Sequence, residues 1–241
     1  MTKLKQAYST PQHAPFYPEP PYQYIGACSL IGVWRANEAA LAQVLPPPLE
    51  LTPERQVIST VCHYPHVTGL GSYNVSALFI RARLNDIEGA FCCYCYMDND
   101  RAVAAGREIW GFPKKLAKVE LIESMEIFKG VVERAEVRIM TFCMNNLRDA
   151  KPEELPPLGN LFNLKLIPSP EKGKPPEVHE LTLIQYENVK THLLIGGDAT
   201  VEFEKSPSDP LYRLEPLEMI GGFYAKQDVE LPHGRVVHRY S

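Results

Sequence analysis

Short runs of alternating hydrophobic and polar residues, separated by prolines and turn residues, recur along most of the chain. Runs of this kind that are rich in Val, Ile, Tyr, Phe and Thr predict short β-strands. We expect strands at 24–36, 56–63, 73–84, 89–97, 116–125, 129–145, 161–168, 178–187, 191–205 and 217–230. Because these strands follow one another with few helices between them, the pattern favours an α+β protein of mostly antiparallel β-structure. We expect the sheet to close into a β-barrel with a few short helices on its outside.

Two short helices are predicted between the strands. Asn37 is suited to cap a helix that begins at Glu38, and Pro46 would end that helix. Asp98 or Asp100 is suited to cap a second helix over residues 100–108.

The chain ends and one proline-rich stretch bear on the domain organisation. Residues 1–21 predict an extended N-terminal arm, and the segment PHGRVVHRYS at 232–241 predicts a short closing helix. The proline-rich stretch 152–176 is compatible with a domain linker or with a loop. Strand-like runs flank it on both sides, so we favour a loop and expect a single domain over residues 1–241.

Composition narrows the class of protein. The 241 residues are 45% hydrophobic, with a net charge of −4 and a pI of about 6.0. Because there is no basic tract or Lys/Arg face, we do not expect nucleic acid as a partner. No stretch approaches the roughly 18 apolar residues that cross a bilayer, and the N-terminus lacks the apolar core of a signal peptide. We therefore expect a soluble, cytoplasmic protein that does not bind membranes.

Cysteine and histidine clusters offer only weak metal signals. The six cysteines are Cys28, Cys62, Cys92, Cys93, Cys95 and Cys143, and a cytosolic chain keeps them reduced. In a regular strand the adjacent Cys92 and Cys93 point to opposite faces while Cys93 and Cys95 share one, yet no matching CxxC pair exists. We favour small core residues over a metal or redox site. His63 and His66 lack a third ligand, and GLG at 69–71 lacks the rest of a dinucleotide fingerprint. No metal or other cofactor is therefore expected.

Two adjacent lysines, Lys114 and Lys115, follow an aromatic-rich segment in GREIWGFPKK, residues 106–115. If a strand begins after Pro113, the two side chains point to opposite faces, so only one of them can enter a given pocket. Burial beside Trp110 and Phe112, and a neighbouring cation, would both disfavour the ammonium form of that lysine. A neutral amine is a nucleophile towards carbonyls. Spacing alone also permits an ordinary pair of surface lysines at the start of a strand.

A resemblance to a known family favours the functional interpretation. The stretch AVAAGREIWGFPKKLA at 102–117 resembles the signature of the acetoacetate decarboxylase family: a Gly-Arg-Glu helix end, an aromatic-Pro step and two lysines. The segments STPQHAPFYPEPPY, PPPLEL, HVTGLGSYNVS, CYMDND and LPHGRVVHRY follow the family pattern in the same order. The resemblance covers essentially the whole chain, and it is nearly gapless from Pro21 to Leu116.

The resemblance implies a fold and a chemistry. It implies a cone-shaped β-barrel that assembles into homo-oligomers, with Lys114 as the Schiff-base lysine inside it and Lys115 as its charged neighbour. Activation of an amine by a neighbouring cation is described for acetoacetate decarboxylase itself, so this role is carried over with the resemblance.

Three positions depart from the decarboxylases. An arginine early in the first strand is replaced by Ala27, a glutamate after the Gly-Leu-Gly-x-Tyr stretch by Val75, and an acidic residue on the preceding strand by Thr60. Without the cation a substrate carboxylate binds less tightly, and without the glutamate a proton must be transferred by another group. The imine can instead tautomerise to an enamine that attacks an aldehyde. Some divergent members of the superfamily that lack the charged trio catalyse such aldol-dehydration with pyruvate.

Three functions follow, in order of preference. The first is aldol condensation and dehydration of a small oxo acid, such as pyruvate, with an aldehyde as second substrate. The second is decarboxylation of acetoacetate or another 3-oxo acid. The third is binding of a small carbonyl compound without catalysis. The first two make the protein a Schiff-base-forming lyase.

Other groups are candidates to replace the lost charges. Arg81 and Arg83 share a face with Val75 in a regular strand, so either can bind a substrate carboxylate or lie solvated at the rim. Glu108, next to Arg107, can offset the lysine charges, transfer protons or form a structural salt bridge. Tyr224 and Tyr240 are candidate acid–base groups, with core or surface packing as the alternative. Trp110, Phe112, Val75 and Ala27 complete the expected substrate-binding set.

Overall fold

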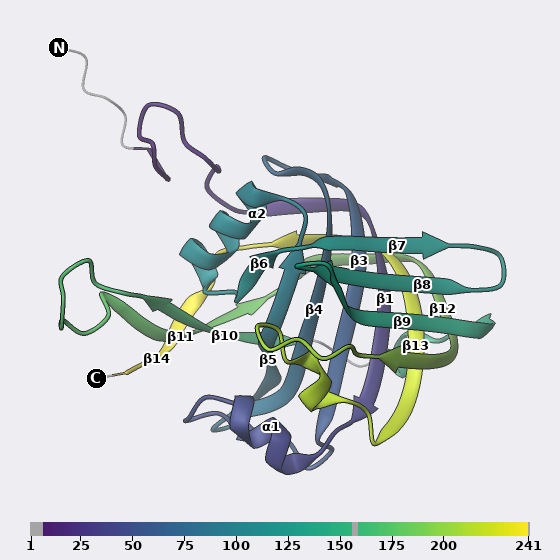
Figure 1. Ribbon diagram of the computed structural model, residues 1–241. Coiled ribbons are helices and arrows are strands. Elements are labelled where there is room, and N and C mark those ends of the chain that lie inside the picture. Colours follow the sequence, from purple (N-terminus) through teal and green to yellow (C-terminus); the bar gives the residue numbers. More distant parts are fainter. Residues whose placement is uncertain (1–6, 156–158, 241) are drawn as a thin grey trace.

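A computed structural model describes residues 7–155 and 159–240. Fourteen strands in these residues form one sheet (Figure 1). They are β1 (Tyr22–Arg35), β2 (Glu50–Leu51), β3 (Gln56–Val67), β4 (Gly71–Leu84), β5 (Ile87–Met97), β6 (Lys114–Leu116), β7 (Lys118–Glu123), β8 (Phe128–Arg134), β9 (Val137–Asp149), β10 (Asn160–Ile167), β11 (Val178–Gln185), β12 (Glu187–Glu202), β13 (Glu218–Leu231) and β14 (Arg235–Arg239).

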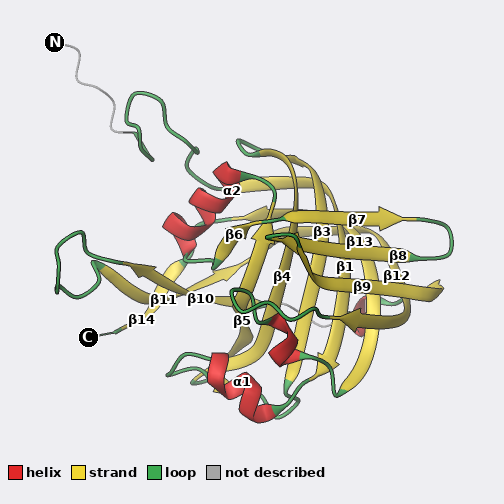
Figure 2. Ribbon diagram, viewed as in Figure 1, coloured by secondary structure: helices red, strands yellow, loops and turns green. Residues whose placement is uncertain are grey.

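The helices are short and lie around the sheet, as Figure 2 shows. They are α1 (Glu38–Val44), α2 (Asp100–Ala105), the π-helical turn η1 (Gly106–Trp110), and the 3₁₀ turns η2 (Pro152–Glu154) and η3 (Leu211–Leu214). The expected cap of α1 is confirmed, because the Asn37 side chain accepts a hydrogen bond from the Ala40 N–H. None of the helices in the described ranges is both long and apolar enough to cross a membrane.

The sheet is mostly antiparallel, as expected, but it is not a closed barrel. Its strand order is β14-β11-β10-β5-β4-β3-β1-β13-β12-β9-β8-β7, with β2 and β6 attached to β4 and β5. Within the part of the chain that is described, the end strands β14 and β7 are not paired with each other. The reason is that β9 occupies the free edge of β12, and the β9-β8-β7 meander then folds across β3, β4 and β5 instead of meeting β14 (Figure 1).

The central strands are buried on both faces because of this overlap. One face of β3 and β4, with Val57, Val61, Leu78 and Ile80, packs with Val119, Val132 and Met140 of the β7–β9 meander. The alternate residues on the other face, among them Thr60, Cys62, Val75 and Ala77, line a cavity. The period-two pattern of these strands therefore separates a packed core from a site.

Most predicted strands agree with the structure to within a few residues, but one predicted strand and the predicted closing helix were wrong. The expected strand 129–145 is a hairpin of β8 and β9, whose turn residues Ala135 and Glu136 both have positive φ. The final segment is the strand β14, which pairs with β11, and not a helix. The N-terminal arm has no regular secondary structure over residues 7–21, although Tyr17 within it is buried. Residues 1–6 of the arm lie outside the described residues.

Candidate active site

The two adjacent lysines start β6, which pairs with the end of β5 in parallel. Their side chains leave the strand on opposite faces, as the sequence predicted. Lys114 is 8% exposed and lines the cavity, whereas Lys115 is partly exposed and points away from it.

Buried surroundings hold the Lys114 side chain in place. Its Nζ donates a hydrogen bond to the Ala102 carbonyl of α2 at 3.0 Å and lies 5.2 Å from the centre of the Phe112 ring. Burial lowers the pKa of Lys114, and the thiols of Cys95 and Cys92 oppose that shift. The result is an amine that loses its proton more readily than a solvated lysine.

Lys115 is held by a different network. Its Nζ lies 2.7 Å from Oδ1 of the buried Asp209, which also accepts from Tyr96 Oη at 3.0 Å and from Arg134 Nε at 3.1 Å. The Lys115 charge is thus paired on the far side of the strand. Burial, and not this neighbour, lowers the pKa of Lys114. A catalytic role for Lys115 stays a prediction.

The helical segment before the lysines begins at an asparagine cap and ends at a glycine. Asn99 caps α2, because its side chain accepts a hydrogen bond from the Ala102 N–H at 2.8 Å. The prediction that Asp98 or Asp100 would cap this helix was wrong. Asp98 instead accepts two hydrogen bonds from Asn74. Gly111 ends η1 with φ of 83°, and a Cβ on it would fall 2.5 Å from the Lys165 Cα. Glycine is therefore needed there both for the backbone conformation and for close packing.

The cavity above Lys114 has a volume of about 490 Å³. β1, β3, β4, β5, β12 and β13 curl around it, and β6 supplies the lysine. Of the described residues that line it, Lys114 is the one with a formally charged side chain. The remaining walls are apolar, aromatic or neutral and polar, so the amine faces a weakly polar space.

All three neutral positions that depart from the decarboxylase pattern face this cavity. Ala27 comes from β1, Thr60 from β3 and Val75 from β4. Phe112 lines the cavity as well, as expected. Compared with the decarboxylase pattern, these three replacements therefore remove charged groups from the cavity wall itself.

Four tyrosines of the cavity were missed by the sequence reasoning: Tyr24, Tyr64, Tyr73 and Tyr186. Tyr73 donates to Tyr24 Oη at 3.2 Å, and the Tyr64 ring packs edge-on against both of them. Burial raises the pKa of Tyr24 to about 12, and it also raises the pKa values of Tyr64, Tyr73 and Tyr186 well above their ordinary value. The four hydroxyls therefore stay protonated and act as neutral hydrogen-bonding groups. Alternation within the strands was the available signal, since Tyr73 and Val75 share a face.

Glu108 and Trp110 lie beside the cavity wall but do not line it. Glu108 accepts a hydrogen bond from Tyr17 of the N-terminal arm and faces a separate surface pocket. Trp110 is buried, donates to the Pro232 carbonyl at 3.1 Å and packs edge-on against Phe112. Both side chains belong to the π-helical turn η1, and neither lines the space around Lys114.

The two candidate tyrosines of the C-terminal region also lie elsewhere. Tyr224 stacks on Phe128 and donates to Glu123 at 2.8 Å, on the side of β13 away from the cavity. Tyr240 stacks on His179 and donates to the Pro47 carbonyl. Neither is brought to Lys114.

Arg81 and Arg83 follow the cavity-facing residues of β4 but lie beyond the cavity. Arg81 lies 3.7 Å from Glu88, and Arg83 forms an ion pair with Glu50 at 2.7 Å. Neither lines the space around Lys114, because β4 extends past its end. The structure therefore does not bring these arginines to the candidate site.

A bulge in β5 rearranges the cysteine cluster. The pairing of β4 with β5 shifts between Leu78↔Tyr94 and Phe79↔Cys92, which leaves Cys93 as the extra residue. Cys92 and Cys95 therefore share the cavity side, while Cys93 donates to the Leu78 carbonyl on the other face. The expectation that Cys93 and Cys95 share a face was wrong for this reason. Cys62 and Cys95 line the cavity, and no metal-ligand cluster occurs among the residues described.

Comparison with known proteins identifies the family. The sequence profile of the family described as Acetoacetate decarboxylase (ADC) matches residues 7–241. The chain belongs to the acetoacetate decarboxylase family. The predicted resemblance is thereby confirmed, and with it a place among the lyases.

Relatives and solved structures match over nearly their whole length. Acetoacetate decarboxylase 3 of Mesorhizobium japonicum is 29% identical, over 98% of this chain and 93% of that protein. Acetoacetate decarboxylase of Ralstonia nicotianae is 30% identical, over 99% and 97%. An acetoacetate decarboxylase structure superimposes with a TM-score of 0.92 at 26% identity, covering 100% and 99%. The enduracididine biosynthesis enzyme MppR, complexed with the condensation product of pyruvate and imidazole 4-carboxaldehyde, shares the fold with a TM-score of 0.79 at 17% identity, covering 98% and 97%.

Proposed function

We propose that this protein forms an imine between Lys114 and a small oxo acid, and that it then joins the resulting enamine to an aldehyde with loss of water. The observation that carries this proposal is the placement of Lys114. It is a buried amine with a lowered pKa, and it faces a cavity whose described lining holds no other formal charge. An amine with a lowered pKa reaches the neutral form that attacks a carbonyl carbon more readily than a solvated lysine does.

The neutral walls favour condensation over decarboxylation. Ala27, Thr60 and Val75 offer neither a cation for a carboxylate nor a carboxylate for proton transfer. One lost arginine contact is worth roughly 1.5–3 kcal/mol, which weakens transition-state binding by about ten- to a hundredfold. Neutral donors remain, among them Ser29, Gln185 and Gln227, and they can hold the carboxylate of an oxo acid more weakly. The volume of about 490 Å³ leaves room for a second substrate.

The fold itself is compatible with this chemistry. MppR has the same fold and has been captured with the product of pyruvate and an aldehyde. Decarboxylation of a 3-oxo acid is the second candidate, because acetoacetate decarboxylases of two genera are 29–30% identical to this chain over nearly its whole length.

Reductive trapping tests the imine. The protein is incubated with pyruvate or with acetoacetate in the presence of borohydride, and the adduct is located by intact and peptide mass. We expect one adduct, on Lys114, with at least one of the two acids. Lys114→Met should abolish it, and the matched variant Lys115→Met should retain it. An adduct on any other lysine, or none with either acid, would refute the proposal and leave a carbonyl-binding protein.

Turnover assays then separate the two reactions. Pyruvate with an unsaturated or aromatic aldehyde should give a conjugated product that absorbs in the near ultraviolet, and acetoacetate should release carbon dioxide slowly or not at all. Rapid carbon dioxide release without aldehyde-dependent absorbance would favour the decarboxylase instead.

A further inference from the structure

The candidate site holds a carbonyl-reactive amine, but its described lining has no carboxylate to transfer protons to and from the substrate. Among the described residues that line the cavity there is no Asp, Glu or His. The tyrosines keep their protons because burial raises their pKa values. Imine formation nevertheless requires a proton donor for the departing water, and enamine formation requires a proton acceptor.

Cys95 lies closest to Lys114 in the backbone pairing. The parallel pairing of β5 with β6 places Cys95 directly opposite Lys114, and both side chains line the same cavity. Both are buried, at 3% and 8% exposure. A thiol and an amine that leave paired positions of adjacent strands on the same face are neighbours within the site.

The bulge in β5 adds a second thiol to this pair. It turns Cys92 to the cavity side, where it packs in the same buried cluster as Cys95. The neighbouring Cys92 thiol and the charge of Lys114 lower the pKa of Cys95, while burial raises the pKa of Cys62, the other thiol of the cavity. A thiol with a lowered pKa exchanges its proton more readily near neutral pH.

We propose that Cys95 is the proton-transfer residue of the site and takes the part that a carboxylate would otherwise play. This inference rests on the proposed function of Lys114. After the amine has added to the carbonyl carbon, the Cys95 S–H gives its proton to the carbinolamine oxygen. The C–O bond breaks, water leaves, and the nitrogen lone pair forms the C=N bond of the iminium ion.

The same sulfur then completes the step to the enamine. The Cys95 thiolate accepts a proton from the α-carbon, the C–H electron pair becomes the C=C bond, and the C=N pair returns to nitrogen. The thiol is regenerated, and no oxidant or metal is involved. The thiolate is transient and is stabilised by the iminium charge and by the Cys92 thiol.

The other titratable groups near this pair do not compete for the role. They are Tyr24 of β1, Cys62 and Tyr64 of β3, Tyr73 of β4, Cys92 of β5 and Tyr186 after β11. The pKa of each of these groups is raised by burial. Arg107 of η1 donates to the Lys114 carbonyl oxygen at 3.2 Å, on the backbone and not at the amine.

The first experiment measures thiol reactivity without any substrate. Alkylation by iodoacetamide at pH 7 is followed by peptide mass for each cysteine. We expect Cys95 to react faster than Cys62, and roughly tenfold more slowly in Lys114→Met, since that near-isosteric change removes the amine and the positive charge of its protonated form. Equal rates at Cys95 and Cys62, with no response to Lys114→Met, would overturn the pairing.

The second experiment measures borohydride trapping with the oxo acid that labels the wild type. Cys95→Ser should slow adduct formation at Lys114 by roughly 10²-fold, as expected for loss of a proton-transfer group. Cys92→Ala should shift the pH dependence of trapping to higher pH, because Cys95 loses the thiol neighbour that lowers its pKa. Cys143→Ser, on β9 and away from the cavity, is the matched control and should behave as the wild type.

The outcomes distinguish the two proposals. A wild-type adduct on Lys114 whose rate changes less than twofold in Cys95→Ser would overturn the role of Cys95 alone. Absence of a Lys114 adduct in the wild type would overturn the proposed function and the role of Cys95 together.

Discussion

Gly106 lies directly against the side chain of Lys114, so closely that a Cβ atom added to it would fall 2.5 Å from the lysine Nζ. The backbone of Gly106 is right-handed helical, with φ of −65°, and an alanine can adopt it without strain. Glycine at this position is thus required by the lysine and not by the turn.

Gly106→Ala should therefore displace Lys114 without unfolding the protein. The added methyl group meets the end of a flexible side chain, which moves aside more easily than backbone. We expect borohydride trapping to fall at least about tenfold, since displacement of a reacting group by about 1 Å can reduce a rate a hundredfold. Gly221→Ala is the matched control, because its nearest neighbour atom is 3.7 Å from the added Cβ. Trapping at the wild-type rate in Gly106→Ala would show that the added methyl group does not displace the Lys114 amine.

Removal of the buried amine should stabilise the protein. The pKa of Lys114 is lowered from 10.5, so between its folded and unfolded pKa values the unfolded chain binds more protons and stability rises with pH. The penalty for burying the amine is therefore full below the folded pKa and vanishes above 10.5. We expect Lys114→Met to raise the melting temperature at pH 7 and to raise it less at pH 10. A difference that stays constant from pH 7 to pH 10 would contradict burial as the cause.

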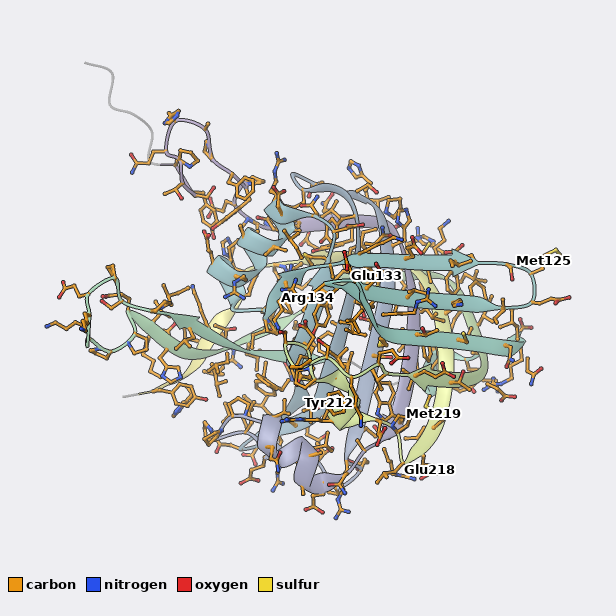
Figure 3. The ribbon with its side chains drawn as sticks, viewed as in Figure 1. Met125, Glu133, Arg134, Tyr212, Glu218 and Met219 are labelled. Atoms are coloured by element: carbon orange, nitrogen blue, oxygen red, sulfur yellow. The ribbon has the colours of Figure 1, made fainter. Side chains whose placement is uncertain are left out.

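Asp209 should matter for stability and little for the amine. It is buried and binds Lys115, Arg134 and Tyr96, and Figure 3 shows Arg134 near the end of β8. Asp209→Asn should cost about 2 kcal/mol, in the range of hydrogen bonds to charged groups. Trapping at Lys114 should persist, because Lys115 lies on the other face of β6. A loss of trapping without a loss of stability would give the network a catalytic role.

The lowered pKa of Asp209 predicts how the stability of the protein changes at acid pH. Burial opposes the ionised form of Asp209, but the hydrogen bonds from Lys115 and Tyr96 prevail and lower its pKa below 3.8. Its contribution is therefore present above pH 3.8 and is lost as the pH falls through the folded pKa. In denaturant titrations, the difference between wild type and Asp209→Asn should be constant from pH 5 to pH 7 and should shrink below pH 3.8. A difference that persists at the lowest pH would argue against the ion pairs.

Activity should withstand a chelator. The proposed chemistry uses an amine and a thiol, and no group of three metal-ligand residues occurs in the described ranges. Turnover should be the same before and after treatment with EDTA. A loss of turnover that zinc restores would bring back a metal interpretation of the cysteines and of His63, which lies 2.8 Å from the Asn74 side chain.

Met125, at the tip of the β7–β8 hairpin, is 97% exposed and projects from the molecule (Figure 3). It lies far along the meander that covers the outer face of β3 and β4, so changes there should leave the cavity unaltered.

The sequence by itself determined the parts of this protein that depend on local backbone geometry. Alternation along each strand predicted where most strands lie, and two adjacent lysines at the start of a strand had to face opposite ways. The departures at Ala27, Thr60 and Val75 were visible when the sequence was compared with the family pattern, and all three residues face the cavity. The cap at Asn37 needed only its own neighbours.

Only the tertiary structure decided which side chains meet. Tyr64, Tyr186 and Gln227 reach one cavity from separate strands and loops, and Asp209 meets Lys115 across 94 positions of sequence. The bulge at Cys93 turned Cys92 towards Lys114, and the pairing of β9 with β12 left the sheet open. A periodic pattern records which face a residue takes within its own strand. It does not record which strand edges pair, or where an extra residue reverses the faces, because these depend on contacts between distant segments.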